Sequence, residues 1–197
     1  MFLLMLPLAV FAASGNFFSY IINEKSRITL LGTTNINTFE CISDSEIPRG
    51  YLVAEILPGS NAIFFSDATL PLKVNSFDCG NRLMNKDLHN VLGGSSSPYI
   101  TIKLNEARPV TSVQMAKSGK IRAEVIISIN GKTKHTDLVI EYQTNNNHTY
   151  YITGTKQLKM SDFGIVPPSP AMGLVKVRDQ IVINFDLLIE TALITRN

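Results

Sequence analysis

The sequence predicts an all-β, antiparallel fold in a single domain with one short helix. Apolar and polar residues alternate most clearly over 121–129 and 181–188, and a period of two marks a strand with one buried face. Turn signals separate such segments, and Asn130-Gly131 is the most specific of them. At 197 residues the chain fits one domain with a full core. Together these observations favour a barrel or a sandwich over a parallel sheet.

The first residues are expected to form a signal peptide. Met1–Gly15 holds an apolar run of about a dozen residues followed by small ones, a length too short to span a bilayer. We therefore expect residues 1–14 to be removed, residues 20–190 to form the domain, and the protein to be periplasmic or secreted. No basic residue precedes the run, and an N-terminal core strand is the alternative. No later stretch is long and apolar enough to cross a membrane.

Several strands are expected before the helix. Arg27–Cys41 is a long β candidate whose register breaks near Gly32. The polar run Ser43–Gly50 contains Pro48 and is typical of a loop. The further strands expected in this part of the chain are Tyr51–Leu57, Ala62–Phe65 and Leu70–Phe77.

Asn81–Leu92 is predicted to be the one helix. Leu88, Val91 and Leu92 recur at helical spacing, and Gly93-Gly94 supplies a C-terminal stop. We expect the apolar stripe to face a sheet and His89 to lie on the solvent-facing side.

The rest of the chain is expected to be β. An alternating strand over 150–160 and another over 181–188 flank a connection rich in Pro and Gly, which ends both strands. Within this connection Val166–Leu174 is the expected rim or lid of a cavity. The total is roughly nine or ten strands. The other strands predicted after the helix are Tyr99–Leu104, Pro109–Ala116, Ile121–Ile129 and Thr136–Tyr142.

The residues that carry chemistry argue against three function classes. A net charge of +2 with scattered basic residues gives no basis for nucleic-acid binding. The three histidines are too dispersed for a metal site, and no cofactor-binding motif is present. No nucleophile stands beside a base, so no catalytic residue and no enzymatic activity is predicted. Asp162 is expected to bind the amides of its own turn.

Cys41 and Cys79 allow two interpretations. In an exported protein a lone pair is commonly bridged, and this bridge would stabilise the fold by roughly 3–4 kcal/mol. Two buried thiols that never meet remain the alternative.

Several motifs give the chain a family resemblance. Ser161–Ile165 is followed by Val177–Ile183, and the helical segment leads through Pro98 into the strand Tyr99–Ile102. Gly119–Leu138 is similar to a strand, turn and returning strand. With these motifs the chain resembles the YceI-like family over about residues 21–188. The segments Thr33–Cys41 and Phe77–Gly80 resemble those of a cysteine-bearing subgroup of exported bacterial proteins.

The resemblance implies a lipocalin-like antiparallel β-barrel of about eight to ten strands that binds a long isoprenoid, such as a polyprenyl quinone or phosphate. An apolar tube can hold such a chain with few polar contacts, because each buried methylene contributes about 0.8 kcal/mol. Gly32 and Gly154, at wall positions, favour a cavity. A homodimer is left open. The candidate cavity-lining residues, for each of which plain core packing is the alternative, are Ile102, Val125, Ile127, Ile140, Ile152, Leu158, Ile183 and Phe185.

A second function class stays open beside lipid binding. In it the barrel is structural, its core is filled by side chains, and its loops bind a protein partner. Large residues pointing inward at every layer would favour this alternative.

Overall fold

The structure, a computed structural model, describes residues 16–43, 47, 49–57, 59–94, 96–110, 117–145 and 148–194. The expected signal peptide and most of the weak strand candidate Pro109–Ala116 lie outside these residues. The described part contains twelve strands in one sheet and one α-helix. The strands are β1 (Asn16–Ile22), β2 (Arg27–Thr34), β3 (Thr38–Ser43), β4 (Gly50–Ile56), β5 (Ile63–Ser66), β6 (Thr69–Lys73), β7 (Phe77–Asp78), β8 (Tyr99–Pro109), β9 (Ser118–Ile129), β10 (Lys132–Thr144), β11 (Thr149–Lys159) and β12 (Val177–Ile194).

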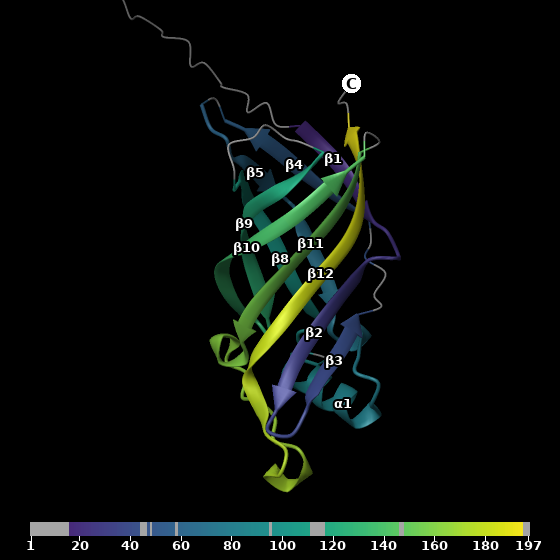
Figure 1. The fold of residues 1–197 in the computed structure, drawn as a ribbon, viewed down its shortest axis with the longest axis vertical. Coiled ribbons are helices and arrows are strands. Elements are labelled where there is room, and N and C mark those ends of the chain that lie inside the picture. Colours follow the sequence, from purple (N-terminus) through teal and green to yellow (C-terminus); the bar gives the residue numbers. More distant parts are fainter. Residues whose placement is uncertain are drawn as a thin grey trace, which may run out of the picture.

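Eight of the strands close into a ring, which confirms the predicted antiparallel barrel. The order is β1-β4-β5-β8-β9-β10-β11-β12, and β12 pairs back onto β1. This last ladder runs from Phe17 opposite Ile194 to Ile22 opposite Ile189. Figure 1 shows the ring strands crossing the molecule at a steep tilt, as closure of a sheet requires.

The barrel is elongated because two strands serve two sets of neighbours. The C-terminal part of β12 pairs with β1, whereas its N-terminal part pairs with β2. In the same way β8 pairs with β5 near its C-terminal end and with β6 near its start. We call the part closed by β1, β4 and β5 the upper half, and the part that contains β2, β3, β6, β7 and the helix the lower half (Figure 1).

The segment predicted as one long strand from Arg27 to Cys41 is a hairpin, so a break near Gly32 was the wrong interpretation. β2 and β3 pair from Ile28 opposite Ser43 to Thr33 opposite Thr38. The Thr34 hydroxyl oxygen accepts hydrogen bonds from the Ile36 and Asn37 amides, at 3.1 and 2.9 Å. This side chain satisfies the turn amides and reverses the chain without a glycine.

The predicted helix is confirmed as α1 (Arg82–Val91), which covers the lower half. The Asn81 side chain caps it by accepting from the Leu83 and Met84 amides. Leu88 and Val91 pack on the core. His89 is half-buried, with Nε2 3.0 Å from the Phe77 carbonyl. The expectation that it faces solvent was therefore wrong.

Cys41 and Cys79 form a disulfide that spans 38 residues of sequence. Cys41 belongs to β3 and is fully buried, whereas Cys79 directly follows β7 and precedes α1. The bond therefore joins the β2–β3 hairpin to the helix-bearing segment of the lower half.

The Asn130-Gly131 turn is confirmed between β9 and β10. Both residues have positive φ, 48° and 70°, as the two central positions of a type I′ turn require. The paired strands continue from Ile129 opposite Lys132 up to Ser118 opposite Gln143.

The connection between β11 and β12 does not cover the barrel. It contains two short 3₁₀ turns, Met160–Phe163 and Ala171–Gly173, and projects from the lower end of the molecule (Figure 1). Val166 and Leu174 are 81% and 77% exposed. Val166–Leu174 is therefore a projecting loop, and its expected role as a lid was wrong.

Candidate site: the barrel interior

The predicted cavity-lining residues all belong to the core side of the sheet. Residues directly opposite one another on paired strands share a face, and Ile102 faces Ile127 while Gly154 faces Phe185. Two of the eight, Ile140 and Ile152, pack against the core but stay partly exposed. The six that are buried, with 1–7% of their surface exposed, are Ile102, Val125, Ile127, Leu158, Ile183 and Phe185.

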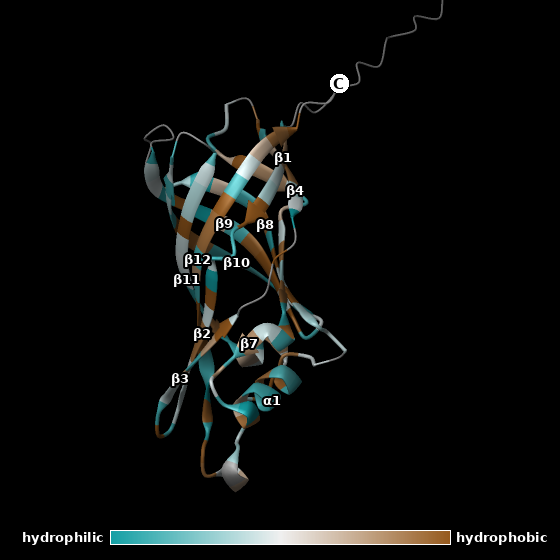
Figure 2. Ribbon diagram, turned by 90° about the vertical axis from the view of Figure 1, so that its right-hand side faces the viewer, coloured by the Kyte–Doolittle hydropathy of each residue, from teal (hydrophilic) through white to brown (hydrophobic). Residues whose placement is uncertain are grey.

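The lower half is filled by side chains. The 3₁₀ turn after β11 contributes Met160 and Phe163, and Ile165 follows it into the core. Figure 2 shows α1 beside β7 in this half. Side chains buried this deeply contribute to the close packing of the core. The large side chains with less than 2% exposure include Phe77, Phe163, Leu72, Ile100, Ile127, Ile129 and Val74, and none of them belongs to β1, β4 or β5.

The inner wall of the upper half is less tightly covered. Ile140 lies four residues before Thr144, the last residue of β10, and thus about 13 Å along the strand from that end. It remains partly exposed although it shares a face with buried Phe185 across Gly154. Ile140 is therefore less closely covered than Phe185, with which it shares this face. Other residues of the same ring that pack on the core yet stay partly exposed are Leu52, Leu104, Ile152, Val177 and Ile189.

A tyrosine supplies a polar group to this half. The Tyr20 hydroxyl donates a 2.7 Å hydrogen bond to the Thr69 carbonyl, and burial raises the pKa of the phenol. Its ring lies over Gly50, where an added Cβ would come within 2.1 Å of the ring carbon Cζ. The glycine thus makes room for the aromatic ring.

The two glycines expected to open the wall do not leave space. A Cβ on Gly32 would come within 2.2 Å of the Phe39 ring, so that ring already fills the site. A Cβ on Gly154 would lie 3.3 Å from the Val139 carbonyl oxygen of the neighbouring strand. Both glycines permit close approach of a neighbour, and the expectation that they favour a cavity was wrong.

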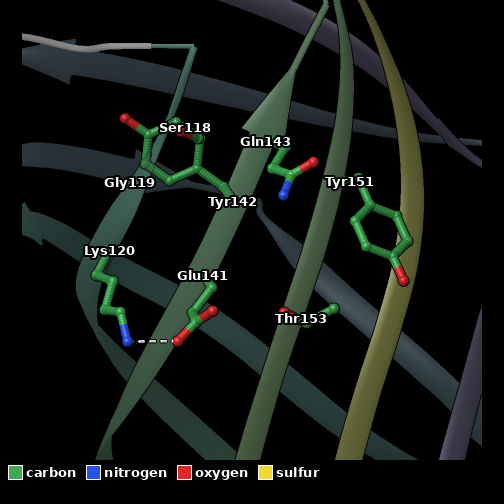
Figure 3. Close-up of a pocket in the computed structure, with 8 residues that line it drawn as sticks. All are labelled: Ser118, Gly119, Lys120, Glu141, Tyr142, Gln143, Tyr151 and Thr153. Atoms are coloured by element: carbon green, nitrogen blue, oxygen red, sulfur yellow. Dashed lines mark ion pairs between the residues drawn. The ribbon is translucent and has the colours of Figure 1, made fainter.

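Two pockets formed by the described residues lie on the outside of the barrel. One, of about 280 Å³, is lined by residues of β9, β10 and β11 (Figure 3), where Lys120 and Glu141 form an exposed ion pair. In the same pocket Tyr151 is hydrogen-bonded to Asp186, which raises the phenol's pKa. The other, of about 420 Å³, adjoins the disulfide. Neither pocket is lined by any of the eight predicted residues.

The carboxylate that holds the turn after β11 was missed. Asp162 forms an ion pair with Lys134, so the prediction that it binds its own turn amides was wrong. Asp179, at the start of β12, accepts from the Ser161 amide at 2.8 Å and from the Ser161 hydroxyl at 2.6 Å. These bonds lower its pKa. No local sequence pattern links two residues eighteen positions apart.

The described residues contain no cluster of three or more His, Cys, Asp or Glu side chains suited to a metal ion. In the same part of the chain, no helix has the length and apolar character needed to cross a membrane.

Comparisons with known proteins agree with this architecture. The model of the YceI-like domain matches residues 53–189. The crystal structure of Burkholderia cenocepacia BcnA aligns with a TM-score of 0.64 at 18% identity, over 85% of this chain and 98% of that one. A polyisoprenoid binding domain from Saccharophagus degradans, described as implicated in plant cell wall breakdown, gives 0.63 at 12% identity, over 88% and 98%. The Campylobacter jejuni YCEI protein gives 0.51 at 16% identity, over 74% and 81%. A sequence comparison with curated proteins found no match.

Proposed function

The chain belongs to the YceI-like family, and from that premise we propose that it binds a long isoprenoid chain, without catalysis, inside the upper half of its barrel. The observation that carries the proposal is the partial exposure of inward-facing residues such as Ile140 and Ile152, whereas the largest side chains of the lower half, Phe77 and Phe163, are 1% exposed. Similarity to a polyisoprenoid binding domain supports it.

The chemistry of the wall suits such a ligand. Ile140, Ile152 and Ile189 offer branched aliphatic surface, and burying each methylene of a ligand against such surface contributes about 0.8 kcal/mol. The affinity would then come from apolar contact along the chain, with few polar groups needed to orient the ligand. A polyprenyl quinone and a polyprenyl phosphate are the two headgroup classes we propose.

We further propose that the protein is periplasmic or secreted. The apolar run at residues 1–15 has the composition of an export signal. The Cys41–Cys79 disulfide is of a kind that persists in oxidising compartments.

The direct test is to purify the full chain from its own host, extract it with organic solvent, and analyse the extract by mass spectrometry. We expect an isoprenoid, and the mass of its headgroup will distinguish a quinone from a phosphate. Recovery of no lipid from protein made in its own host would count against binding. Light scattering on the same preparation tells whether the loaded protein is a monomer or a homodimer.

A matched pair of substitutions localises the site. Ile152→Trp places a large ring on the inner wall of the upper half, and we expect it to abolish recovery of the lipid. Val139→Trp is the control, because Val139 is 44% exposed and lies one residue from Ile140, so its side chain points to the opposite face of the sheet. Equal lipid recovery from both variants would place the ligand elsewhere.

The tight packing around Phe77 and Phe163 in the lower half keeps a structural barrel with partner-binding loops as the second candidate. In that case side chains also fill the interior of the upper half. No lipid would then be recovered, and Ile152→Trp would destabilise the fold by overpacking, by about 1–3 kcal/mol.

A further inference from the structure

Two loops meet at the lower end of the molecule. We use the name tip for two segments together: residues 33–38, which are the β2–β3 turn with the strand residues beside it, and residues 164–178, which run from the end of the Met160–Phe163 turn into the start of β12. Both loops reach the lower end in Figures 1 and 2. Asn35 joins them, because its side chain accepts from the Lys176 amide at 2.7 Å and donates to the Leu174 carbonyl at 3.0 Å. Its own amide also donates to the Lys176 carbonyl at 3.0 Å.

Hydrogen bonds within the longer loop also fix its shape. The Gly173 and Val175 amides donate to the Pro170 carbonyl, at 3.2 and 3.3 Å, and the Val177 amide donates to the Pro168 carbonyl at 3.1 Å. The backbone of the tip is therefore held in one arrangement, and its side chains are presented outward by a fixed scaffold.

The tip exposes four large apolar side chains. Ile36 is 69% exposed, Val166 81%, Leu174 77% and Met172 105%. Met172 also has a φ of 54°, a left-handed conformation that favours Gly or Asn. Neither the exposure nor the backbone conformation of Met172 is explained by folding stability, and such a combination points to contact with something outside the chain.

The charged residues of the tip indicate what kind of surface it can contact. The two loops contain Lys176 but no acidic residue, and Arg178 is the exposed residue at the end of the longer one. The acidic residues within two positions of the two segments are Glu40, Asp162 and Asp179; Asp162 is paired with Lys134, and Asp179 is engaged by Ser161. The tip is thus apolar with a basic border.

We propose that the tip docks on the surface of an anionic lipid bilayer. The four apolar side chains enter the boundary between headgroups and acyl chains, while Lys176 and Arg178 contact the anionic headgroups. A projecting set of single apolar side chains beside cations suits this boundary, where apolar burial and attraction to anionic lipid add together. This inference goes beyond the proposed ligand and does not depend on it, since the tip lies outside the barrel interior.

The chain has no tryptophan, so Leu174→Trp in the full chain creates a fluorescent probe that reports only on the tip. We expect its emission to move to shorter wavelength with phosphatidylcholine vesicles that contain phosphatidylglycerol, and to be quenched when the acyl chains carry bromine. The matched control is Ile56→Trp, because Ile56 is 62% exposed at the opposite end of the barrel (Figure 1, end of β4). We expect no shift from the control.

Two further variants in the Leu174→Trp background test the apolar residues and the cations of the tip separately. Replacing Val166 by Ser and Met172 by Asn should weaken binding by about tenfold for each side chain, and Asn fits the left-handed backbone. Replacing Lys176 and Arg178 by Gln should weaken binding to the anionic vesicles by about fivefold for each charge. Circular dichroism checks that each variant is folded.

Each outcome of the vesicle experiments leads to a different conclusion. No shift of Leu174→Trp with any vesicle would overturn the proposal and leave a protein partner as the occupant of the tip. Equal shifts on neutral and anionic vesicles would overturn the role of the two cations. A shift from Ile56→Trp without one from Leu174→Trp would assign membrane contact to the upper end.

Discussion

At Gly50 a missing side chain has a specific use, because the ring of Tyr20 occupies the place where a Cβ would stand. We expect Gly50→Ala to lower the free energy of unfolding by about 1–3 kcal/mol, since the added methyl forces the ring from its position. Denaturant unfolding measures the loss. In a Tyr20→Leu background the same substitution should cost less, because the ring is gone. The same cost in both backgrounds would contradict this explanation.

Asp179 gives the fold a pH dependence. The Ser161 hydroxyl and amide hold its pKa below the ordinary 3.8, so its contribution is present above pH 3.8 and is lost as the pH falls through the lower value in the folded protein. We expect Asp179→Asn to cost about 1 kcal/mol at pH 7, less than the roughly 1.5–3 kcal/mol typical of a hydrogen bond to a charged group, because the carboxylate is close to solvent.

Denaturant unfolding from pH 7 to pH 2 measures this effect, and the gap between parent and variant should close below pH 3.8. The control is Asp137→Asn, which removes an exposed ion pair with Arg122 and should cost at most a few tenths of a kcal/mol. A gap that stays constant with pH would refute the role of the carboxylate.

The side of the sheet on which a residue lies could be predicted from the sequence, whereas its degree of burial could not. Alternation placed Ile127 and Ile152 on the same side of the sheet, and the ladders agree. It could not tell that Ile127 would be 1% exposed and Ile152 partly exposed. That difference depends on which other segments close each half of the barrel, which local periodicity does not report.

Among the elements, the disulfide ties the helix-bearing segment to the β2–β3 hairpin. We expect reduction to lower the free energy of unfolding by roughly 3–4 kcal/mol, because the bond closes a 38-residue loop. Denaturant midpoints with and without reductant measure the change. The double variant Cys41→Ala, Cys79→Ala is the control and should not respond to reductant. A parent midpoint that reductant leaves unchanged would contradict the expected stabilisation.

Strands with clear alternation and specific turns were predictable as elements, and β9, β10 and the turn between them are confirmed. The β2–β3 turn was missed because Thr34 and Asn37 reverse the chain through side-chain hydrogen bonds that resemble a polar strand in the sequence. β1 was missed as a separate strand because it begins at Asn16, directly after the apolar leader. Its apolar residues merge with that run.

At the scale of the whole molecule, the two halves should respond differently to the loss of core volume. Ile127→Ala, in the closed part, should cost about 2–5 kcal/mol, because the surrounding side chains leave a cavity. Ile152→Ala should cost less, because Ile152 is already partly exposed. Denaturant unfolding of lipid-free protein compares the two. Equal costs would indicate that the upper half is packed as tightly as the lower half and would favour the structural barrel.

Closure of the ring by β1 and β12 also sets the order of events during synthesis. Residues 17–22 pair with residues 189–194. One edge of β1 therefore stays unpaired until nearly the whole described chain has left the ribosome. At about 5–20 residues per second, the intervening stretch takes on the order of 10–30 s to make. During that time the growing chain keeps an open sheet edge. The barrel therefore closes only when its last strand arrives.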